Sequence, residues 1–247
     1  MNQNMTVEPK GCVIIPAYLE ERRIRGVVQN VLQYIQPVIV IDDGSPDQTS
    51  AEASSAGATV IKHDQNLGKG AALNTGFAYA IKQKFDYVIT MDADGQHSPA
   101  DIPTFVEAYE RTARLHRYAK HCGQGVSALV GNRMDAPTGM PLVRKLTNMF
   151  MSWYLSKQMG QHVPDTQSGF RLYAAHALPF LATQSTRYAA ESETLLRLAV
   201  KKIKINSVPI TVIYRDEKSK IRPFRDTIRF FRMVRRFRKE NNGYCDN

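Results

Sequence analysis

VIVIDDGSPD, residues 38–47, runs four β-branched side chains directly into a turn that contains three aspartates. Such an uninterrupted apolar run is typical of a strand that is covered on both faces, as in a parallel sheet. Residues 49–56 then have a helical pattern, with Asp47 and Thr49 as start signals. Because ligands of parallel α/β sheets bind at the carboxyl ends of the strands, the aspartates mark the place to look for a site.

The same alternation of strand and helix continues on both sides of this stretch. Further strands are predicted at residues 12–16, 58–62 and 87–91, and helices at 20–34, 70–82 and 99–114. Ser98 and Pro99 suit the cap and first position of the last of these helices. The order predicts an α/β fold with a mostly parallel, doubly wound sheet and right-handed crossovers.

The second half of the chain is less regular. It predicts strands at residues 128–132, 170–174 and 205–214, and helices at 144–157 and 191–202. One face of the helix at 144–157 is apolar; it consists of Leu146, Met149, Phe150, Trp153 and Tyr154. We expect this face to pack into the core, with the lining of an acceptor groove as the alternative.

Composition narrows the class of protein. The 247 residues are 43% hydrophobic and 23% charged, which is an ordinary globular balance. No run approaches the ~20 apolar residues of a membrane-spanning helix, and the first ten residues lack the apolar core of a secretory signal. Three scattered cysteines, Cys12, Cys122 and Cys245, do not form a disulfide framework. We expect a reduced, cytoplasmic protein.

Most of the net charge of +10 lies near the end of the chain. Residues 215–239 contain eleven Lys or Arg and three acids, which gives +8. A cationic end on a nearly neutral body favours a docking device over a nucleic-acid binder, because the strand ends are acidic. We therefore expect no nucleic-acid partner.

Pro223 suits the first position of a terminal helix. At 100° per residue, Arg225, Arg229, Arg232 and Arg236 form one stripe of this helix. The opposite arc consists of Phe224, Ile228, Phe230, Phe231, Val234 and Phe237. This pattern predicts a basic amphipathic helix at an anionic membrane surface, with packing of the arc on the protein itself as the alternative. It divides the chain into a catalytic domain, 1–222, and a helix and tail, 223–247.

A second acidic cluster, DADGQH at residues 92–97, follows the strand at 87–91. Asp92 and Asp94 can both face a hard divalent ion, with Gln96 as a further oxygen ligand, so the cluster predicts a Mg²⁺ or Mn²⁺ site. Two capped turns would be the purely structural explanation. Two clusters on alternate strands, at the edge where ligands bind, favour the metal site.

Other motifs are absent. Gly68-Lys69-Gly70 is not a phosphate-binding P-loop, because His63 stands where its first glycine is required. No G-x-G-x-x-G follows the first strand, which disfavours a dinucleotide-binding dehydrogenase, and no serine or cysteine has the nucleophile-elbow sequence of a hydrolase.

Together the motifs resemble the family 2 glycosyltransferases. They are IIPAYLE (14–20), VIDDGSPD (40–47), NLGKG (66–70), MDADGQH (91–97), GNR (131–133), DTQSGFR (165–171) and the charged stretch at 214–221. Within the family, the likeness is greatest to dolichyl-phosphate mannose synthase and the bacterial polyprenyl-phosphate sugar transferases. Leu19 departs from the pattern, since the family usually has Asn there.

The resemblance implies a glycosyltransferase A-type fold, a nucleotide-sugar donor of the GDP-mannose or UDP-glucose type, and inverting transfer. It implies donor-binding positions at Pro16, Ala17, Tyr18, Glu20, Asp43, Lys69, Asp92 and Ala93. It also implies that Asp94, with Asp92 and Gln96, carries the metal. The hydrophobic C-terminal segments of some relatives are missing, so we expect peripheral contact with the cytoplasmic face of the membrane, in cell-envelope synthesis.

The acceptor decides the remaining chemistry. A phosphate monoester is mostly a dianion near neutral pH, so it needs positive charge to place it and no general base. Arg133 and Arg171, beside Ser168 and the backbone of Gly169, suit that task. Asp165 is either a loop carboxylate or the base for a hydroxyl acceptor. We therefore expect transfer of a hexose to a polyprenyl phosphate, with transfer to a hydroxyl of a saccharide or lipid as the alternative.

Overall fold

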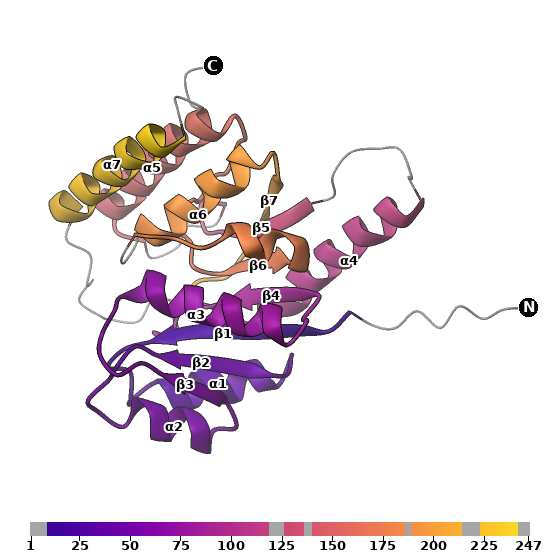
Figure 1. Ribbon diagram of the computed structural model, residues 1–247, viewed down its shortest axis with the longest axis vertical. Coiled ribbons are helices and arrows are strands. Elements are labelled where there is room, and N and C mark those ends of the chain that lie inside the picture. Colours follow the sequence, from indigo (N-terminus) through magenta and orange to yellow (C-terminus); the bar gives the residue numbers. More distant parts are fainter. Residues whose placement is uncertain (1–8, 119–125, 136–139, 186–188, 214–222, 242–247) are drawn as a thin grey trace, which may run out of the picture.

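The computed structural model describes residues 9–118, 126–135, 140–185, 189–213 and 223–241. A seven-stranded sheet lies between two layers of helices (Figure 1). The strands are β1 Gly11–Ala17, β2 Val38–Asp42, β3 Thr59–Lys62, β4 Tyr87–Thr90, β5 Val126–Asn132, β6 Arg171–Ala174 and β7 Lys204–Pro209. The α-helices are α1 Ile24–Leu32, α2 Thr49–Ser55, α3 Lys69–Lys82, α4 Ile102–Tyr118, α5 Leu142–Met159, α6 Ala189–Val200 and α7 Pro223–Glu240. Short 3₁₀ helices span η1 Pro99–Asp101 and η2 Ala175–Phe180.

The sheet has the order β3-β2-β1-β4-β6-β5-β7. β6 pairs antiparallel with both β4 and β5, and the other pairings are parallel. The expected mostly parallel α/β sheet is confirmed. Because β6 runs against its neighbours, its first residue, Arg171, lies at the same edge as the carboxyl ends of the parallel strands.

Alternation along the strands explains their continuous apolar runs. In β1, Cys12 and Ile14 belong to one core, and Val13 and Ile15 belong to the other. The first core is covered by α3, α5, α6 and α7, and the second by α1, α2 and α4. Both faces of the sheet are therefore dry, as expected of a doubly wound fold.

α7 contributes to the first core directly. Phe230, Met233, Val234 and Phe237 are buried, while Ile228 and Phe231 are exposed. Arg236, half-buried, donates to the carboxylate of Glu193 on α6. The apolar arc expected here thus packs on the body along one edge and faces outward along the other. The side chains of Phe224 and Arg225, and the charged stretch at 214–221, lie outside the described residues.

Two expectations from the sequence are wrong. The strand expected to reach residue 214 ends at Pro209, and Val212 forms only an isolated bridge with His97. Most of the apolar face expected on α5 is not core: Leu146, Met149, Phe150 and Trp153 are about half exposed. Tyr154, the fifth residue of that face, is partly buried and packs against the first core. α5 instead buries its other side, including Met151 and Leu155. Helical periodicity indicates an apolar face but does not indicate whether another element covers it.

Candidate active site

The two acidic clusters lie on either side of β1. β2 and β4 both pair with β1, and Ala17 at the end of β1 is in register with Asp42 at the end of β2. Asp92 follows the end of β4, so the aspartates converge at the carboxyl edge of the sheet. This is the edge at which α/β sheets bind ligands.

The first cluster fixes the turn and the loop that precedes α3. Asp43 accepts hydrogen bonds from the backbone N–H of Leu67 (3.0 Å) and Gly68 (2.7 Å), and from His63 Nδ1 (2.8 Å). Gly44 has φ +72°, and a Cβ there would lie 2.4 Å from the backbone of Gln65. The aspartate expected at the donor therefore also holds the loop that carries Lys69.

The end of β1 and the turn that follows it contain one strained residue, Leu19. Pro16 lines the pocket described below, Ala17 is buried, and Tyr18 is 40% exposed. Glu20 is buried and forms an ion pair with Arg23 (2.8 Å). Leu19 has φ +56°, a conformation that costs a residue with a bulky Cβ and suits Asn or Gly.

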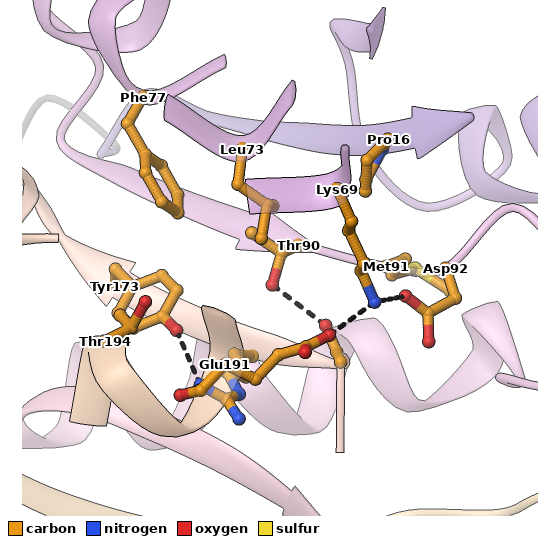
Figure 2. Close-up of a pocket in the computed structure, with 12 residues that line it drawn as sticks. Pro16, Lys69, Leu73, Phe77, Thr90, Met91, Asp92, Tyr173, Glu191 and Thr194 are labelled. Atoms are coloured by element: carbon orange, nitrogen blue, oxygen red, sulfur yellow. Dashed lines mark hydrogen bonds and ion pairs between the residues drawn. The ribbon is translucent and has the colours of Figure 1, made fainter. Parts of the chain in front are cut away.

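Lys69 is the centre of a small pocket above the sheet (Figure 2). Its Nζ lies 2.5 Å from Asp92 Oδ1 and also donates to Glu191 Oε1. Burial alone would lower the pKa of Lys69, but Asp92 and Glu191 outweigh burial and raise the pKa well above its usual value. The lysine is therefore a permanent cation. The pocket is lined by Pro16, Lys69, Leu73, Phe77, Thr90, Met91, Asp92, Gly169, Arg171, Tyr173, Glu191 and Thr194.

The pKa values of Asp92 and Asp94 are shifted in opposite directions. Burial opposes ionisation of Asp92, but Lys69 outweighs it, and the pKa of Asp92 falls below its usual range. Burial, followed by repulsion from Asp92, raises the pKa of Asp94 to about 6. Asp94 Oδ1 also accepts from the backbone N–H of Gln96 (3.0 Å), which tightens the turn. Burial lowers the pKa of the neighbouring His97 to about 4, so this imidazole is neutral.

These residues fit a divalent ion that is shared with a substrate. Two carboxylates that repel each other are relieved by a cation, and oxygen ligands suit Mg²⁺ or Mn²⁺. In the part of the chain that the structure describes, no three acidic, histidine or cysteine side chains gather as a metal site. An ion at Asp92 and Asp94 would therefore take further ligands from the substrate. Ala93, between them, is buried in the second core.

Asp165 and Arg133 form a buried ion pair. Arg133 Nε donates to Oδ2 of Asp165 (2.6 Å) and Nη2 donates to Oδ1 (2.8 Å), while the backbone N–H of Arg133 also donates to Oδ2 (3.2 Å). Burial works against the charge of Asp165, but Arg133 outweighs it and lowers the pKa. Such a carboxylate is a weak base, and its proton-accepting positions are occupied.

Arg171 ties the loop at 165–169 to α6. Its guanidinium donates to the carbonyl oxygens of Ser168 (2.7 Å), Thr166 (2.8 Å) and Glu191 (2.8 Å), and it is 1% exposed. Ser168 is fully buried, and among the described residues its hydroxyl has no hydrogen-bond partner. Gly169 is required by close approach, because a Cβ there would lie 2.7 Å from the Asp92 carboxylate.

The pocket joins five residues that the sequence singled out with others that it did not; the five are Pro16, Lys69, Asp92, Gly169 and Arg171. For Glu191, at the start of α6, the sequence predicts only a helix; the surrounding residues AAESETLL (189–196) have no signal beyond the helical pattern. For Thr90, whose hydroxyl donates to the carbonyl of Gly169 (2.9 Å), the sequence predicts only a strand.

Comparison with known proteins agrees with this geometry. The model of the family described as "Glycosyl transferase family 2" matches residues 12–175.

The chain belongs to this family.

It is a glycosyltransferase, as the motifs indicated. It is 32% identical to the UDP-N-acetylglucosamine–dolichyl-phosphate N-acetylglucosaminyltransferase of Methanococcus voltae, over 82% of this chain and 85% of the relative. It is 29% identical to the undecaprenyl-phosphate mannosyltransferase of Micrococcus luteus, over 82% and 83%.

A solved structure shares the fold. Glucosyl-3-phosphoglycerate synthase from Mycobacterium tuberculosis, in complex with Mn²⁺, UDP and phosphoglyceric acid, matches with a TM-score of 0.65 and 20% identity. The match covers 91% of this family 2 chain and 75% of the other. Among the described residues of this glycosyltransferase, no helix is both long and apolar enough to span a membrane.

Proposed function

We propose that this glycosyltransferase transfers a hexose, with inversion, from a nucleotide sugar of the GDP-mannose or UDP-glucose type to a polyprenyl phosphate. The reaction would take place at the cytoplasmic face of the membrane. Two relatives support the acceptor class, because the names of the Methanococcus and Micrococcus enzymes specify dolichyl phosphate and undecaprenyl phosphate. The polyprenol monophosphomannose synthase of Mycolicibacterium smegmatis, 26% identical, adds a third.

The observation that carries the proposal is the state of Asp165. A hydroxyl acceptor needs a general base within hydrogen-bond reach, and Asp165 was the candidate for that role. Its two oxygens are bound by Arg133, its pKa is lowered, and it is fully buried. A phosphate acceptor needs no base, since it is already an anion near neutral pH. The alternative with a hydroxyl acceptor is therefore disfavoured.

On the donor side, Asp92, Asp94 and Gln96 would hold a Mg²⁺ or Mn²⁺ ion. When bound, the ion supplies positive charge to the diphosphate leaving group. Lys69, a permanent cation beside Asp92, would add charge at the same place. Tyr18 is exposed enough to stack on the base, while Glu20 and Asp43 would meet the base and ribose from the end of the neighbouring strands.

On the acceptor side, the chain's part is to place the phosphate. Arg133 is held in one orientation by Asp165 and lies near enough to Asp92 to lower the pKa of that carboxylate. We assign Arg133 to the acceptor phosphate as a fixed positive charge rather than as a fork, because its Nε and Nη2 are already bound to Asp165. Arg171, whose nitrogens donate to three backbone carbonyls, is better suited to hold Ser168 and Gly169 in place.

The test is a pair of acceptors that differ only in the phosphate. The purified chain is incubated with a panel of radiolabelled nucleotide sugars, Mn²⁺, and either a polyprenyl phosphate or the corresponding free polyprenol, dispersed in detergent. Label should enter the organic phase with the phosphate and not with the alcohol. Transfer to the polyprenol, or to saccharides alone, would support the hydroxyl-acceptor alternative and overturn the proposal.

A further inference from the structure

The exposed apolar row on α5 needs a partner. Leu142, Leu146, Met149, Phe150 and Trp153 lie on one side of the helix, and Leu142 is 69% exposed. Isolated apolar side chains on a surface need no explanation, but a contiguous row marks an interaction site. The opposite side of α5 is buried in the first core, so this helix has two apolar sides and only one of them is covered by the protein.

α7 extends this row into a surface. The two helices lie side by side on the outside of the molecule (Figure 1), and their aromatic rings touch: Phe231 is 6.5 Å from Phe150 and 5.4 Å from Tyr154, between ring centroids. Phe231 and Ile228 are exposed on α7. We call the exposed apolar residues of both helices the α5–α7 face.

Positive charge surrounds this face. α5 has three basic residues and no acid, and α7 has seven basic residues and two acids. Arg232 and Arg235 are exposed on the same side of α7 as Ile228. The ammonium of Lys157 lies over the ring of Trp153, 4.6 Å from its centroid. The face thus combines aromatic and aliphatic side chains with cations, and it has few acids of its own.

We propose that the α5–α7 face is the surface by which this chain docks on an anionic lipid bilayer, a role that rests on the proposed transfer to a lipid-linked acceptor. Trp, Phe and Leu beside Arg and Lys are the composition of helices that lie in the interface of a bilayer. Each basic residue near an anionic surface adds about 1 kcal/mol. A second copy of the chain is a poorer occupant, because it would bring an equally cationic rim against this one.

Docking in this way would bring the membrane to the acceptor side of the site. Ser152, on the buried side of α5, accepts a hydrogen bond from the backbone N–H of Thr166 (2.9 Å), next to Asp165. The exposed row begins at Leu142, a short connection after Arg133. A bilayer docked on the exposed row and the loop at 165–169 would then contact opposite sides of the same helix, so docking would hold the membrane next to the element that supports Asp165 and its partner Arg133.

Trp153 permits a direct test, because it is the only tryptophan of the chain. The full chain is mixed with vesicles of phosphatidylcholine with or without phosphatidylglycerol, without any polyprenyl phosphate. The emission of Trp153 should shift to shorter wavelength with the anionic vesicles, and shallow brominated lipids should quench it. Co-sedimentation with unchanged emission would place docking on another surface and overturn the proposal.

Leu146→Ser/Phe150→Ser should reduce binding to anionic vesicles at least tenfold. Tyr34→Ser/Ile81→Ser is the matched control, since it removes one aromatic and one aliphatic exposed side chain elsewhere and should bind as wild type. Wild-type binding by Leu146→Ser/Phe150→Ser would reject the docking surface. So would a wild-type dimer that this variant converts to a monomer, because a second copy would then be the occupant.

Transfer to an acceptor dispersed in detergent separates this inference from the proposed function. Leu146→Ser/Phe150→Ser should retain transfer in detergent while it loses transfer to acceptor in vesicles. If the wild-type chain transfers no sugar to a polyprenyl phosphate in detergent, the proposed function fails whatever the vesicle result. If transfer in detergent is normal and the variant is also normal on vesicles, only the docking surface fails.

Discussion

The guanidinium of Arg133 donates to both carboxylate oxygens of Asp165, at 2.6 and 2.8 Å, and both side chains are buried. One charge of such a pair cannot be removed without leaving the other desolvated and unpaired. The pair therefore fixes the place of a cation near Asp92 and at the same time withdraws Asp165 from proton transfer.

Asp165→Asn should lower the free energy of unfolding by about 3 kcal/mol, since Arg133 would be left buried without its counter-charge. It should raise KM for the acceptor more than it lowers kcat, because an amide holds the guanidinium less firmly. Urea unfolding and steady-state kinetics measure the two effects. A folded variant with normal KM for both substrates and kcat reduced by several orders of magnitude would restore Asp165 as a general base.

Asp94→Asn should stabilise the metal-free protein at neutral pH while it abolishes stabilisation by Mn²⁺ with a nucleoside diphosphate. The pKa of Asp94 is raised from 3.8 to about 6 by burial and by Asp92. A raised carboxyl pKa means that the folded state binds the proton more tightly, so wild-type stability rises as pH falls from about 6 to about 4. The gain from Asn should approach 3 kcal/mol above pH 7 and vanish near pH 4.

Thermal unfolding across this pH range, with and without Mn²⁺, measures the effect of Asp94→Asn. Asp64→Asn, at an exposed position, is the control and should change neither quantity. If Mn²⁺ with the diphosphate stabilises Asp94→Asn as much as wild type, Asp94 is not a ligand of the metal.

Glu191→Gln should weaken binding of Mn²⁺ about tenfold, which corresponds to ~1.4 kcal/mol. Lys69 would keep Asp92 as its only acidic partner among those that the structure describes, and so would compete more strongly with the ion for that carboxylate. Titration followed by electron paramagnetic resonance measures the affinity. Glu193→Gln, two positions along α6 but paired with Arg197 and Arg236, is the control. Equal affinities for the two variants would show that Glu191 does not act through Lys69.

The sequence predicts the parallel half of the sheet well. Runs of β-branched residues such as Val38–Asp42 are buried on both faces, and they indicate a strand whichever elements pack against them. It does not predict that β6 is antiparallel. Arg171–Ala174 has the residues of a buried strand whichever way it runs, and its direction is set by pairing with β4 and β5, which are distant in the chain. The fold class could therefore be predicted from the sequence, whereas the full order of strands in the sheet could not.

Some residues of the candidate site could also be predicted from the sequence, and others could not. Asp92 and Asp94 belong to a short motif whose residue types indicate metal chemistry, so they could be singled out before the structure. Lys69 could be singled out only through the family resemblance. Glu191 could not, because its importance arises from a contact with Lys69 across 122 residues of chain. The sequence also indicated the apolar row of α5 without its environment, since nothing in a helical period specifies which neighbours cover it.

Leu19→Asn should raise the free energy of unfolding by about 1 kcal/mol. Leu19 has φ +56°, a conformation that costs a residue with a Cβ roughly 1–2 kcal/mol and that Asn tolerates better. Its side chain is 46% exposed, so little apolar burial is lost. Urea unfolding measures the change. Leu67→Asn, at an exposed position of ordinary φ, is the control; an equal gain there would show that polarity, and not backbone strain, is responsible.

Ending the chain after Arg222 should prevent cooperative folding. Truncation removes four buried side chains of the first core, Phe230, Met233, Val234 and Phe237, and it takes Arg236 from Glu193. Truncating a single buried Phe to Ala typically costs ~3–5 kcal/mol, and a whole domain is stable by only ~5–15 kcal/mol.

Arg232→Glu/Arg235→Glu is the control for the truncation, because it changes only exposed positions of α7. It should unfold as wild type does while it loses binding to anionic vesicles. Circular dichroism during heating compares the three chains. A truncated protein that melts cooperatively near the wild-type temperature would mean that α7 is a separable appendage, and its contacts with the core would then contribute little to stability.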